Sequence, residues 1–227
     1  MPVSTTHLLY LHGFRSSPAS AKAQVMARWM QQHRPDVRWW CPQLPESPRE
    51  AAGLIEAGTA GWPRESMGVI GSSLGGFYAT WLACKLGCKA VLLNPAVNPA
   101  RDLARYIGEH PVWQAPDEKI FFQAHFVDEL RQMSASNGAG VLSISEQMHP
   151  LLLAIMAKGD EVLSWREMAS AYAGCHIKLL EGGDHALGDF EPEHLGDVTR
   201  FLGLSKAEPS FGESVTRPLS TSPHRSP

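Results

Sequence analysis

The chain has 227 residues, of which 44% are hydrophobic and 19% are charged. This composition allows one domain of ordinary size or at most two small ones, and it excludes general disorder, a collagen-like chain and a coiled coil. With 20 Lys and Arg against 23 Asp and Glu, the formal net charge is -3. Because no basic stripe is present to bind phosphates, we expect no nucleic-acid partner.

The cysteines and the N-terminal residues bear on compartment and metal content. Cys84 and Cys88 are four residues apart, but no second pair of ligands at a suitable spacing accompanies them, so we interpret them as small buried side chains and expect no metal. The start of the chain lacks the features of a signal peptide, which predicts a cytoplasmic protein with reduced thiols. No apolar run approaches the roughly 20 residues of a membrane helix, so we expect no stable membrane insertion.

Short apolar runs alternate with helical patterns along most of the chain. The runs predict strands at residues 7–11, 37–41, 67–71, 89–93, 151–157 and 176–180. Apolar residues at helical spacing predict helices at residues 20–32, 48–57, 74–86, 164–172 and 192–202. Strands that are apolar on both faces and alternate with helices are typical of a mostly parallel sheet covered by helices, so the sequence predicts the α/β class.

Two segments depart from this alternation. Residues 95–149 separate the fourth and fifth predicted strands. This is far more than a simple crossover needs, and we interpret the segment as an insertion and a candidate lid. Residues 205–227 are rich in Ser and Pro and lack apolar periodicity. They are predicted to form a disordered tail after a domain that spans residues 1–204.

A serine lies at the join between the third predicted strand and the helix that follows it. Gly71, Ser73 and Gly75 match the pattern Gly-x-Ser-x-Gly, with Ser73 in the centre. A nucleophilic serine on a sharp strand-to-helix turn needs small neighbours because the flanking segments approach closely. The pattern predicts Ser73 as a nucleophile, and the alternative is a serine N-cap in a Gly-rich turn.

A serine nucleophile needs a base, and the base needs a carboxylate that fixes its tautomer. Asp160 follows the fifth predicted strand and His185 follows the sixth. Both positions lie where the carboxyl ends of parallel strands hold active sites, and the chain order Ser, Asp, His is that of α/β-hydrolases. We therefore predict Ser73, His185 and Asp160 as a catalytic triad, with Glu161 and Asp189 as alternatives for the carboxylate.

The developing oxyanion needs backbone N–H donors. One candidate is Leu74, at the start of the helix after Ser73, and the other is Phe14, in the loop after the first strand, with Gly13 as the alternative. His12 in the same loop could orient it by hydrogen bonding. Asp184, beside His185, is interpreted as a turn former.

Aromatic and Met side chains of the insertion have two interpretations. They either line an acyl pocket or simply pack the lid. The residues concerned are Trp113, Phe121, Phe122, Phe126 and Met133.

These motifs together resemble a known family, the YqiA-like small esterases of the α/β-hydrolase superfamily. The resemblance extends to about residue 204 and is carried by YLHGF at 10–14, SSP at 16–18, PQLP at 42–45, GSSLGG at 71–76, ATWL at 79–82, NPAV at 94–97, GDEVL at 159–163 and EGG at 181–183. The chain departs from the family at Asp184, where Asn is common, and in its Ser/Pro tail. The resemblance implies an α/β-hydrolase fold, a three-layer αβα sandwich with about six strands, and the triad named above.

The function expected from these observations is hydrolysis of carboxylic acyl esters or thioesters through an acyl-enzyme, with a small-molecule substrate and no organic cofactor. The same triad could serve an acyltransferase or a peptidase, and a binding protein without catalysis is an alternative of another class. The substrate, the acyl-chain length and the oligomeric state do not follow from the sequence.

Overall fold

A computed structural model describes residues 4–134 and 142–204. Its main sheet has six strands in the order β2-β1-β3-β4-β7-β8, and each neighbouring pair is parallel. The strands are β1 (His7–Leu11), β2 (Arg38–Trp40), β3 (Met67–Ser72), β4 (Lys89–Leu93), β7 (Leu152–Ala157) and β8 (His176–Leu180). This arrangement confirms the predicted α/β class, and every predicted strand is present.

The helices between these strands also match the predicted pattern to within a few residues. They are α1 (Ala21–His33), α2 (Pro48–Thr59), α3 (Leu74–Leu86) and α6 (Trp165–Ala171), with a short 3-10 helix at Arg64–Ser66. After the last strand come α7 (Phe190–Glu193) and α8 (Leu195–Phe201). The prediction of one closing helix at residues 192–202 was wrong. His194 has φ -126°, which is not helical, and the chain there divides into α7 and α8.

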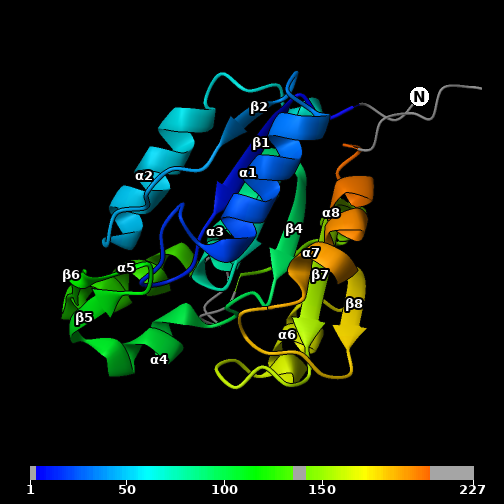
Figure 1. The fold of residues 1–227 in the computed structure, drawn as a ribbon. Coiled ribbons are helices and arrows are strands. Elements are labelled where there is room, and N and C mark those ends of the chain that lie inside the picture. The colour runs from blue at the N-terminus through cyan, green and yellow to red at the C-terminus, as the bar shows by residue number, and fades with distance from the viewer. Residues whose placement is uncertain (1–3, 135–141, 205–227) are drawn as a thin grey trace, which may run out of the picture.

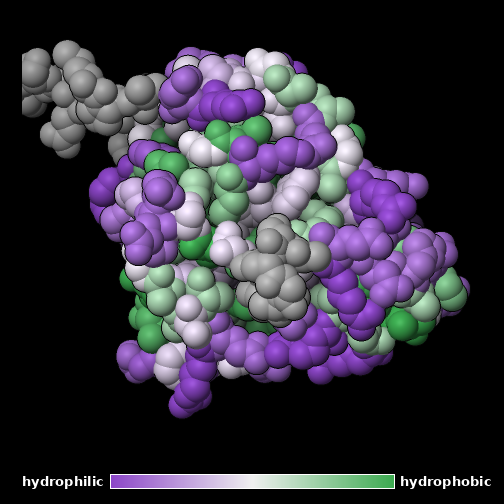
Figure 2. Space-filling model, turned by 180° about the vertical axis from the view of Figure 1, so that it is seen from behind, coloured by the Kyte–Doolittle hydropathy of each residue, from purple (hydrophilic) through white to green (hydrophobic). Residues whose placement is uncertain are grey.

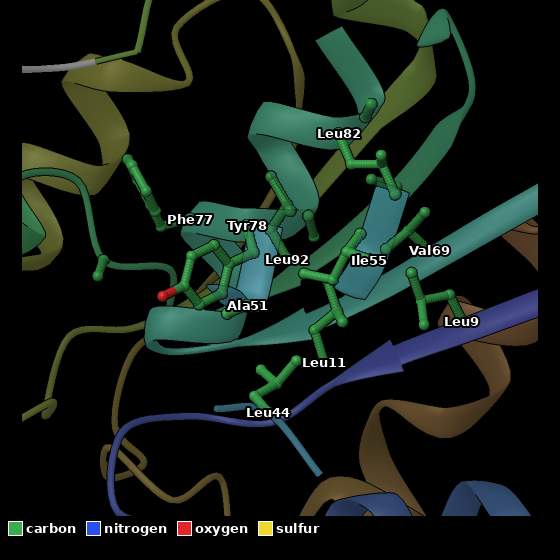
Figure 3. Close-up of a cluster of buried hydrophobic side chains, with 14 of the residues drawn as sticks. Leu9, Leu11, Leu44, Ala51, Ile55, Val69, Phe77, Tyr78, Leu82 and Leu92 are labelled. Atoms are coloured by element: carbon green, nitrogen blue, oxygen red, sulfur yellow. The ribbon is translucent and has the colours of Figure 1, made fainter. Parts of the chain in front are cut away.

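Helices cover both faces of the sheet because successive strand residues point to opposite sides. Leu8 and Tyr10 of β1 belong to a core cluster with residues of α1, α7 and α8. Leu9 and Leu11 belong to a second cluster with residues of α2 and α3. Figure 1 shows the resulting three layers. Figure 3 shows the second cluster, in which the side chains of Leu9, Leu11, Ile55, Val69 and Leu82 lie together.

The segment 95–149 has its own secondary structure. It contains α4 (Pro99–Leu103), a 3-10 helix at Ala104–Tyr106, an antiparallel hairpin of β5 (Gly108–Val112) and β6 (Ala115–Phe122), α5 (Ala124–Ser134) and a 3-10 helix at Glu146–Leu151. The arrows of β4, β7 and β8 in Figure 1 point toward the end of the molecule where α4 and the hairpin lie. The segment therefore flanks the carboxyl edge of the sheet. Residues 135–141 and the predicted tail at 205–227 lie outside the described residues.

The surface is mixed in character. Figure 2 shows hydrophilic residues over much of one face, with hydrophobic residues in small groups between them. Three large hydrophobic side chains of the segment 107–121 are exposed, namely Ile107, Trp113 and Phe121. Within residues 4–134 and 142–204, no helix has both the length and the apolar character needed to cross a bilayer.

Truncation of the core should cost stability according to burial. Leu92 lies in β4 and is fully buried, so Leu92→Ala leaves a cavity and should lower the free energy of unfolding by about 2–5 kcal/mol. Ile177 in β8 is 40% exposed, so Ile177→Ala should cost less than about 1 kcal/mol. Urea unfolding of both variants measures the difference. Equal losses would contradict the burial assigned to β4.

Candidate active site

Ser73 occupies a strained turn between β3 and α3. Its φ is 57° and its ψ is -119°, a conformation that costs a non-glycine residue about 1–3 kcal/mol. Neighbouring backbone holds it in place: the Ser73 N–H donates to Leu93 O at 3.0 Å, and the Ala96 N–H donates to Ser73 O at 3.0 Å. The turn thus presents the Ser73 side chain at the carboxyl edge of the sheet.

The glycines around Ser73 are needed because backbone segments touch there. A methyl group at Gly75 would lie 2.0 Å from Leu11 O, and one at Gly71 would lie 2.2 Å from Gly75 O. A methyl group at Gly76 would lie 2.7 Å from Pro95 Cβ. None of these three glycines has a positive φ. Close approach, and not backbone conformation, therefore explains the predicted Gly-x-Ser-x-Gly pattern.

The structure brings Ser73, His185 and Asp160 together in one chain of hydrogen bonds. His185 Nε2 lies 3.0 Å from Ser73 Oγ. Its other ring nitrogen, Nδ1, lies 2.8 Å from Asp160 Oδ2. The three residues come from the loops after β3, β8 and β7, which end at the same edge because the strands are parallel.

The Asp160 carboxylate is held as a hydrogen-bond acceptor on both oxygens. Its Oδ1 accepts the backbone N–H groups of Val162 and Leu163, each at 2.8 Å, and its side chain is fully buried. With Oδ2 facing His185 Nδ1, the carboxylate favours the tautomer in which Nδ1 carries the proton. Nε2 then has a free electron pair directed at the Ser73 hydroxyl, which is the arrangement of a general base.

The alternative carboxylates have other partners. Glu161 Oε2 accepts the backbone N–H of His185 at 3.0 Å, so it helps to hold the loop and leaves the ring to Asp160. Asp189 Oδ1 lies 3.3 Å from His194 Nε2. Asp184 Oδ1 accepts the Gly188 N–H at 3.2 Å, in agreement with the interpretation of Asp184 as a turn former.

Two further residues support the His185 loop and were not identified from the sequence. Asn94 is fully buried; its side-chain amide donates to the carbonyl oxygens of Asp184 and His185, and its Oδ1 accepts the Ala157 N–H at 2.8 Å. Lys22 of α1 donates to Ala186 O. Burial lowers the pKa of Lys22 to about 8, although the charges of Asp184 and Asp160 oppose this effect. The position of Asn94 directly after β4, at the edge where sites lie in parallel sheets, is the sequence feature that could have identified it.

The loop after β1 lies against Ser73. A methyl group at Gly13 would be 3.2 Å from Ser73 Cβ and 3.6 Å from its Oγ, so the backbone at Gly13 is close to the Ser73 hydroxyl. The Leu74 N–H belongs to the first turn of α3, where backbone donors have no intrahelical acceptor. Both residues predicted as oxyanion donors line the same cavity as Ser73.

His12 fixes this loop to the chain after β2. Its Nε2 accepts the Leu44 N–H at 3.1 Å, and its Nδ1 lies 3.0 Å from Gly13 O. Since Nε2 accepts a hydrogen bond, the proton is on Nδ1 and the ring is neutral. Burial lowers the pKa of His12, against a smaller raising effect of the Gly13 carbonyl.

A pocket of about 120 Å³ opens beside Ser73 and His185. Its apolar lining includes Leu74, Ala96, Leu103, Tyr106, Trp113 and Leu163. Of the aromatic and Met residues considered for this role, only Trp113 lines this pocket. Phe122 and Phe126 are buried in the core, Met133 packs against it and Phe121 is exposed. Packing is thus the role of most of these residues.

Cys84 and Cys88 are poor candidates for a nucleophile. Burial raises the pKa of Cys88 to about 12 and that of Cys84 to about 11, so both thiols stay protonated at neutral pH. Within the described ranges 4–134 and 142–204, no three His, Cys, Asp or Glu side chains are grouped so as to hold a metal ion.

Comparison with known proteins identifies a family and a fold. Residues 7–203 match a family described as "Uncharacterised protein family (UPF0227)". A candidate hydrolase from Agrobacterium vitis S4 is similar in structure, with a TM-score of 0.63, 15% identity and 88% of each chain covered. The esterase Pf2001 of Pyrococcus furiosus has a TM-score of 0.57 and 16% identity, covering 88% of this chain and 80% of that one.

A third similar structure is Est1E of Butyrivibrio proteoclasticus with ferulic acid bound. Its TM-score is 0.57 and its identity 14%, with 88% of this chain and 87% of that chain covered. At these identities the likeness establishes a shared fold.

Substitution of Gly75 tests the close approach at the turn. Gly75→Ala would place a methyl group 2.0 Å from Leu11 O, so we expect the free energy of unfolding to fall by about 3 kcal/mol. Gly53 in α2 has no atom within 4 Å of such a methyl group, so Gly53→Ala should raise stability by up to about 1 kcal/mol. Urea unfolding distinguishes the two signs. An unchanged or more stable Gly75→Ala protein would contradict the contact.

The neutral state of His12 predicts a pH-dependent stability. Because the folded-state pKa is below the ordinary value of 6.5, the unfolded chain binds a proton that the folded chain does not. Stability is therefore lost as pH falls below about 6.5, with a slope of at most about 1.4 kcal/mol per pH unit from this one group. His12→Gln keeps a donor and an acceptor but does not titrate. Urea unfolding between pH 7 and pH 5 should give a shallower slope for this variant, and an equal slope would argue against the assignment.

Proposed function

Because this chain belongs to UPF0227, the YqiA family that its motifs indicate, and has the α/β-hydrolase fold, we propose that it is a serine hydrolase of carboxylic esters or thioesters. The observation that carries the proposal is the hydrogen-bonded chain from Ser73 through His185 to Asp160. A serine hydroxyl is a weak nucleophile until such a base accepts its proton.

The proposed reaction begins when His185 Nε2 takes the proton of Ser73 Oγ and Oγ attacks the substrate carbonyl. The N–H groups of Phe14 and Leu74 stabilise the oxyanion, and Asp160 stabilises the imidazolium. His185 then gives the proton to the leaving alcohol or thiol, and an acyl-Ser73 intermediate remains. Water, deprotonated by the same base, attacks this intermediate and releases the acid.

The size of the pocket supports a limited acyl group. Its volume of about 120 Å³ is somewhat less than the ~150 Å³ of an engineered protein cavity that holds benzene. A short aliphatic acyl group fits such a volume. A longer chain would extend beyond the pocket toward solvent.

Two other activities use the same geometry. An acceptor other than water could attack the acyl-enzyme, and an amide could replace the ester, so acyl transfer and peptide cleavage are retained as alternatives. A binding protein without catalysis has no need of a base oriented by a buried carboxylate. The contacts of Asp160 therefore favour an enzyme.

Reaction with a fluorophosphonate tests the proposal without knowledge of the substrate. This reagent modifies activated serines, so mass spectrometry should find it on Ser73. His185→Ala should abolish the labelling. With a short-chain aryl ester, Ser73→Ala should lower kcat/KM by at least about a thousandfold, because it removes the nucleophile.

Ser72 provides a matched control, because it is the last residue of β3 and does not belong to the triad. Ser72→Ala should retain labelling at Ser73. No modification of Ser73, although the pocket admits the reagent, would refute the serine-hydrolase proposal and favour a binding protein.

A further inference from the structure

We propose that the substrate carries a negative charge close to its ester or thioester group, and that Arg15 and Arg105 bind this charge at the mouth of the pocket. This inference rests on the proposed function, because it concerns the same pocket. Both arginines line the pocket that contains Ser73 and His185.

Arg15 is held firmly by the β5–β6 hairpin. Its carbonyl oxygen accepts the Trp113 N–H at 2.8 Å, and its Nε donates to Pro111 O at 2.9 Å. The guanidinium carbon lies 4.1 Å from the centre of the Trp113 ring. These contacts hold the guanidinium plane in one orientation and leave its terminal N–H groups for a carboxylate or phosphate, which a planar fork of donors binds well.

The conformation of Arg15 is also unusual. Its φ is 58°, which a non-glycine residue adopts at a cost of about 1–3 kcal/mol. Such strain persists where surrounding contacts fix it, and here those contacts come from the hairpin. The side chain is thereby presented at the pocket directly after Phe14.

Arg105 supplies a second cation to the same pocket. It is exposed, and its guanidinium carbon lies 5.0 Å from the centre of the Tyr106 ring. Tyr106 in turn contacts Phe14, with 5.7 Å between ring centroids. Both arginines are thus attached to the aromatic residues that line the pocket.

The charge balance of the pocket is positive. Among the described residues that line it, the one carboxylate is that of Asp102, whose Oδ1 accepts a hydrogen bond from Arg101 Nε at 2.8 Å. Arg101 also binds Glu167 through two hydrogen bonds of 2.9 and 2.6 Å. In the part of the chain that the structure describes, neither Arg15 nor Arg105 has a carboxylate within 4.0 Å. Arg101 therefore supplies one positive charge for the two carboxylates of Asp102 and Glu167, which leaves one negative charge in this group against the two positive charges of Arg15 and Arg105.

This local charge contrasts with the whole chain, whose formal net charge is -3. An anionic substrate gains little attraction from the protein as a whole, so binding depends on the local field. The apolar pocket walls strengthen that field because they reduce the screening by water. One surface arginine without a carboxylate partner is weak evidence for an anion site. Here two such arginines lie beside an apolar pocket that contains a hydrogen-bonded serine and histidine, and this combination points to recognition of an anion.

The anion could belong to either half of the ester, and paired substrates separate the two cases. On the acyl side, the 4-nitrophenyl ester of adipic acid with a free carboxylate is compared with its methyl ester. On the leaving-group side, 4-carboxyphenyl butyrate is compared with its methyl ester. We expect kcat/KM to be at least about tenfold higher for the anionic member of one pair, which corresponds to about 1.4 kcal/mol, and this preference should weaken at high salt.

Variants connect the preference to the arginines. Arg15→Gln and Arg105→Gln should each reduce the ratio of anionic to neutral kcat/KM by about three- to tenfold, and Arg15→Lys should reduce it less because the charge remains. The ratio is the readout, since a disturbed loop would lower both rates together. Arg38 is a matched control, because it also lies over a tryptophan, Trp62, but at the amino end of β2. Arg38→Gln should leave the ratio unchanged.

The outcomes separate this inference from the proposed function. The inference alone would be overturned if Ser73 is labelled and kcat/KM is equal within both substrate pairs. It would also be overturned if neither arginine variant changes the preference for the anionic substrate. Absence of both labelling and hydrolysis would overturn the proposed function. If Ser73 is labelled but no ester is cleaved, the test is whether adipate slows the labelling. The inference is supported if adipate slows it, the dimethyl ester does not, and Arg15→Gln removes the effect of adipate. The inference is refuted if adipate does not slow the labelling in this way.

Discussion

At the turn between β3 and α3, backbone packs directly against backbone, and a methyl group on Gly75 would lie 2.0 Å from the carbonyl oxygen of Leu11. This contact sets the distance between the start of α3 and the end of β1. Ser73 directly precedes α3, and Phe14 follows β1. The contact between Gly75 and Leu11 therefore brings the serine close to the segment of its predicted oxyanion donor. The strain at Ser73 is offset by the hydrogen bonds that join this turn to Leu93 and Ala96.

The parallel sheet extends this arrangement to the other two residues. Asp160 and His185 follow β7 and β8, whose carboxyl ends meet the same edge as that of β3. The register of the strands does not by itself fix the position of the His185 loop. Hydrogen bonds from Asn94 do so. From the end of β4, its amide binds the backbone of the His185 loop and of Ala157. One buried side chain therefore joins the ends of β4 and β7 to the loop that carries His185, where a lost hydrogen bond would leave buried polar groups unpaired.

Local patterns predicted the strands and the larger helices, since each depends on residues that are neighbours in sequence. The same holds for Ser73, Asp160 and His185, because residue type and position after a strand were both readable. The β5–β6 hairpin was not predicted because most of its residues are exposed and each strand contains a proline, so that the strand pattern is weak. A few of its residues, such as Phe122, contact the core. The roles of Asn94 and Lys22 depend on hydrogen bonds to residues 63 to 164 positions away. The position of Asn94 after β4 marks it as a candidate, but one sequence does not show which residues it binds.

The hairpin connects substrate recognition with the chemistry in the proposed mechanism. Trp113 lines the pocket and binds the backbone of Arg15, and Arg15 is covalently joined to Phe14, the predicted oxyanion donor. A charge bound at Arg15 thus stabilises the segment whose N–H must be in place when the tetrahedral intermediate forms. Binding energy from a charged group that does not itself react can then be used in the transition state, which raises kcat as well as affinity. In this proposal, the insertion between β4 and β7 lines the pocket and, through Trp113, supports the segment that carries Phe14.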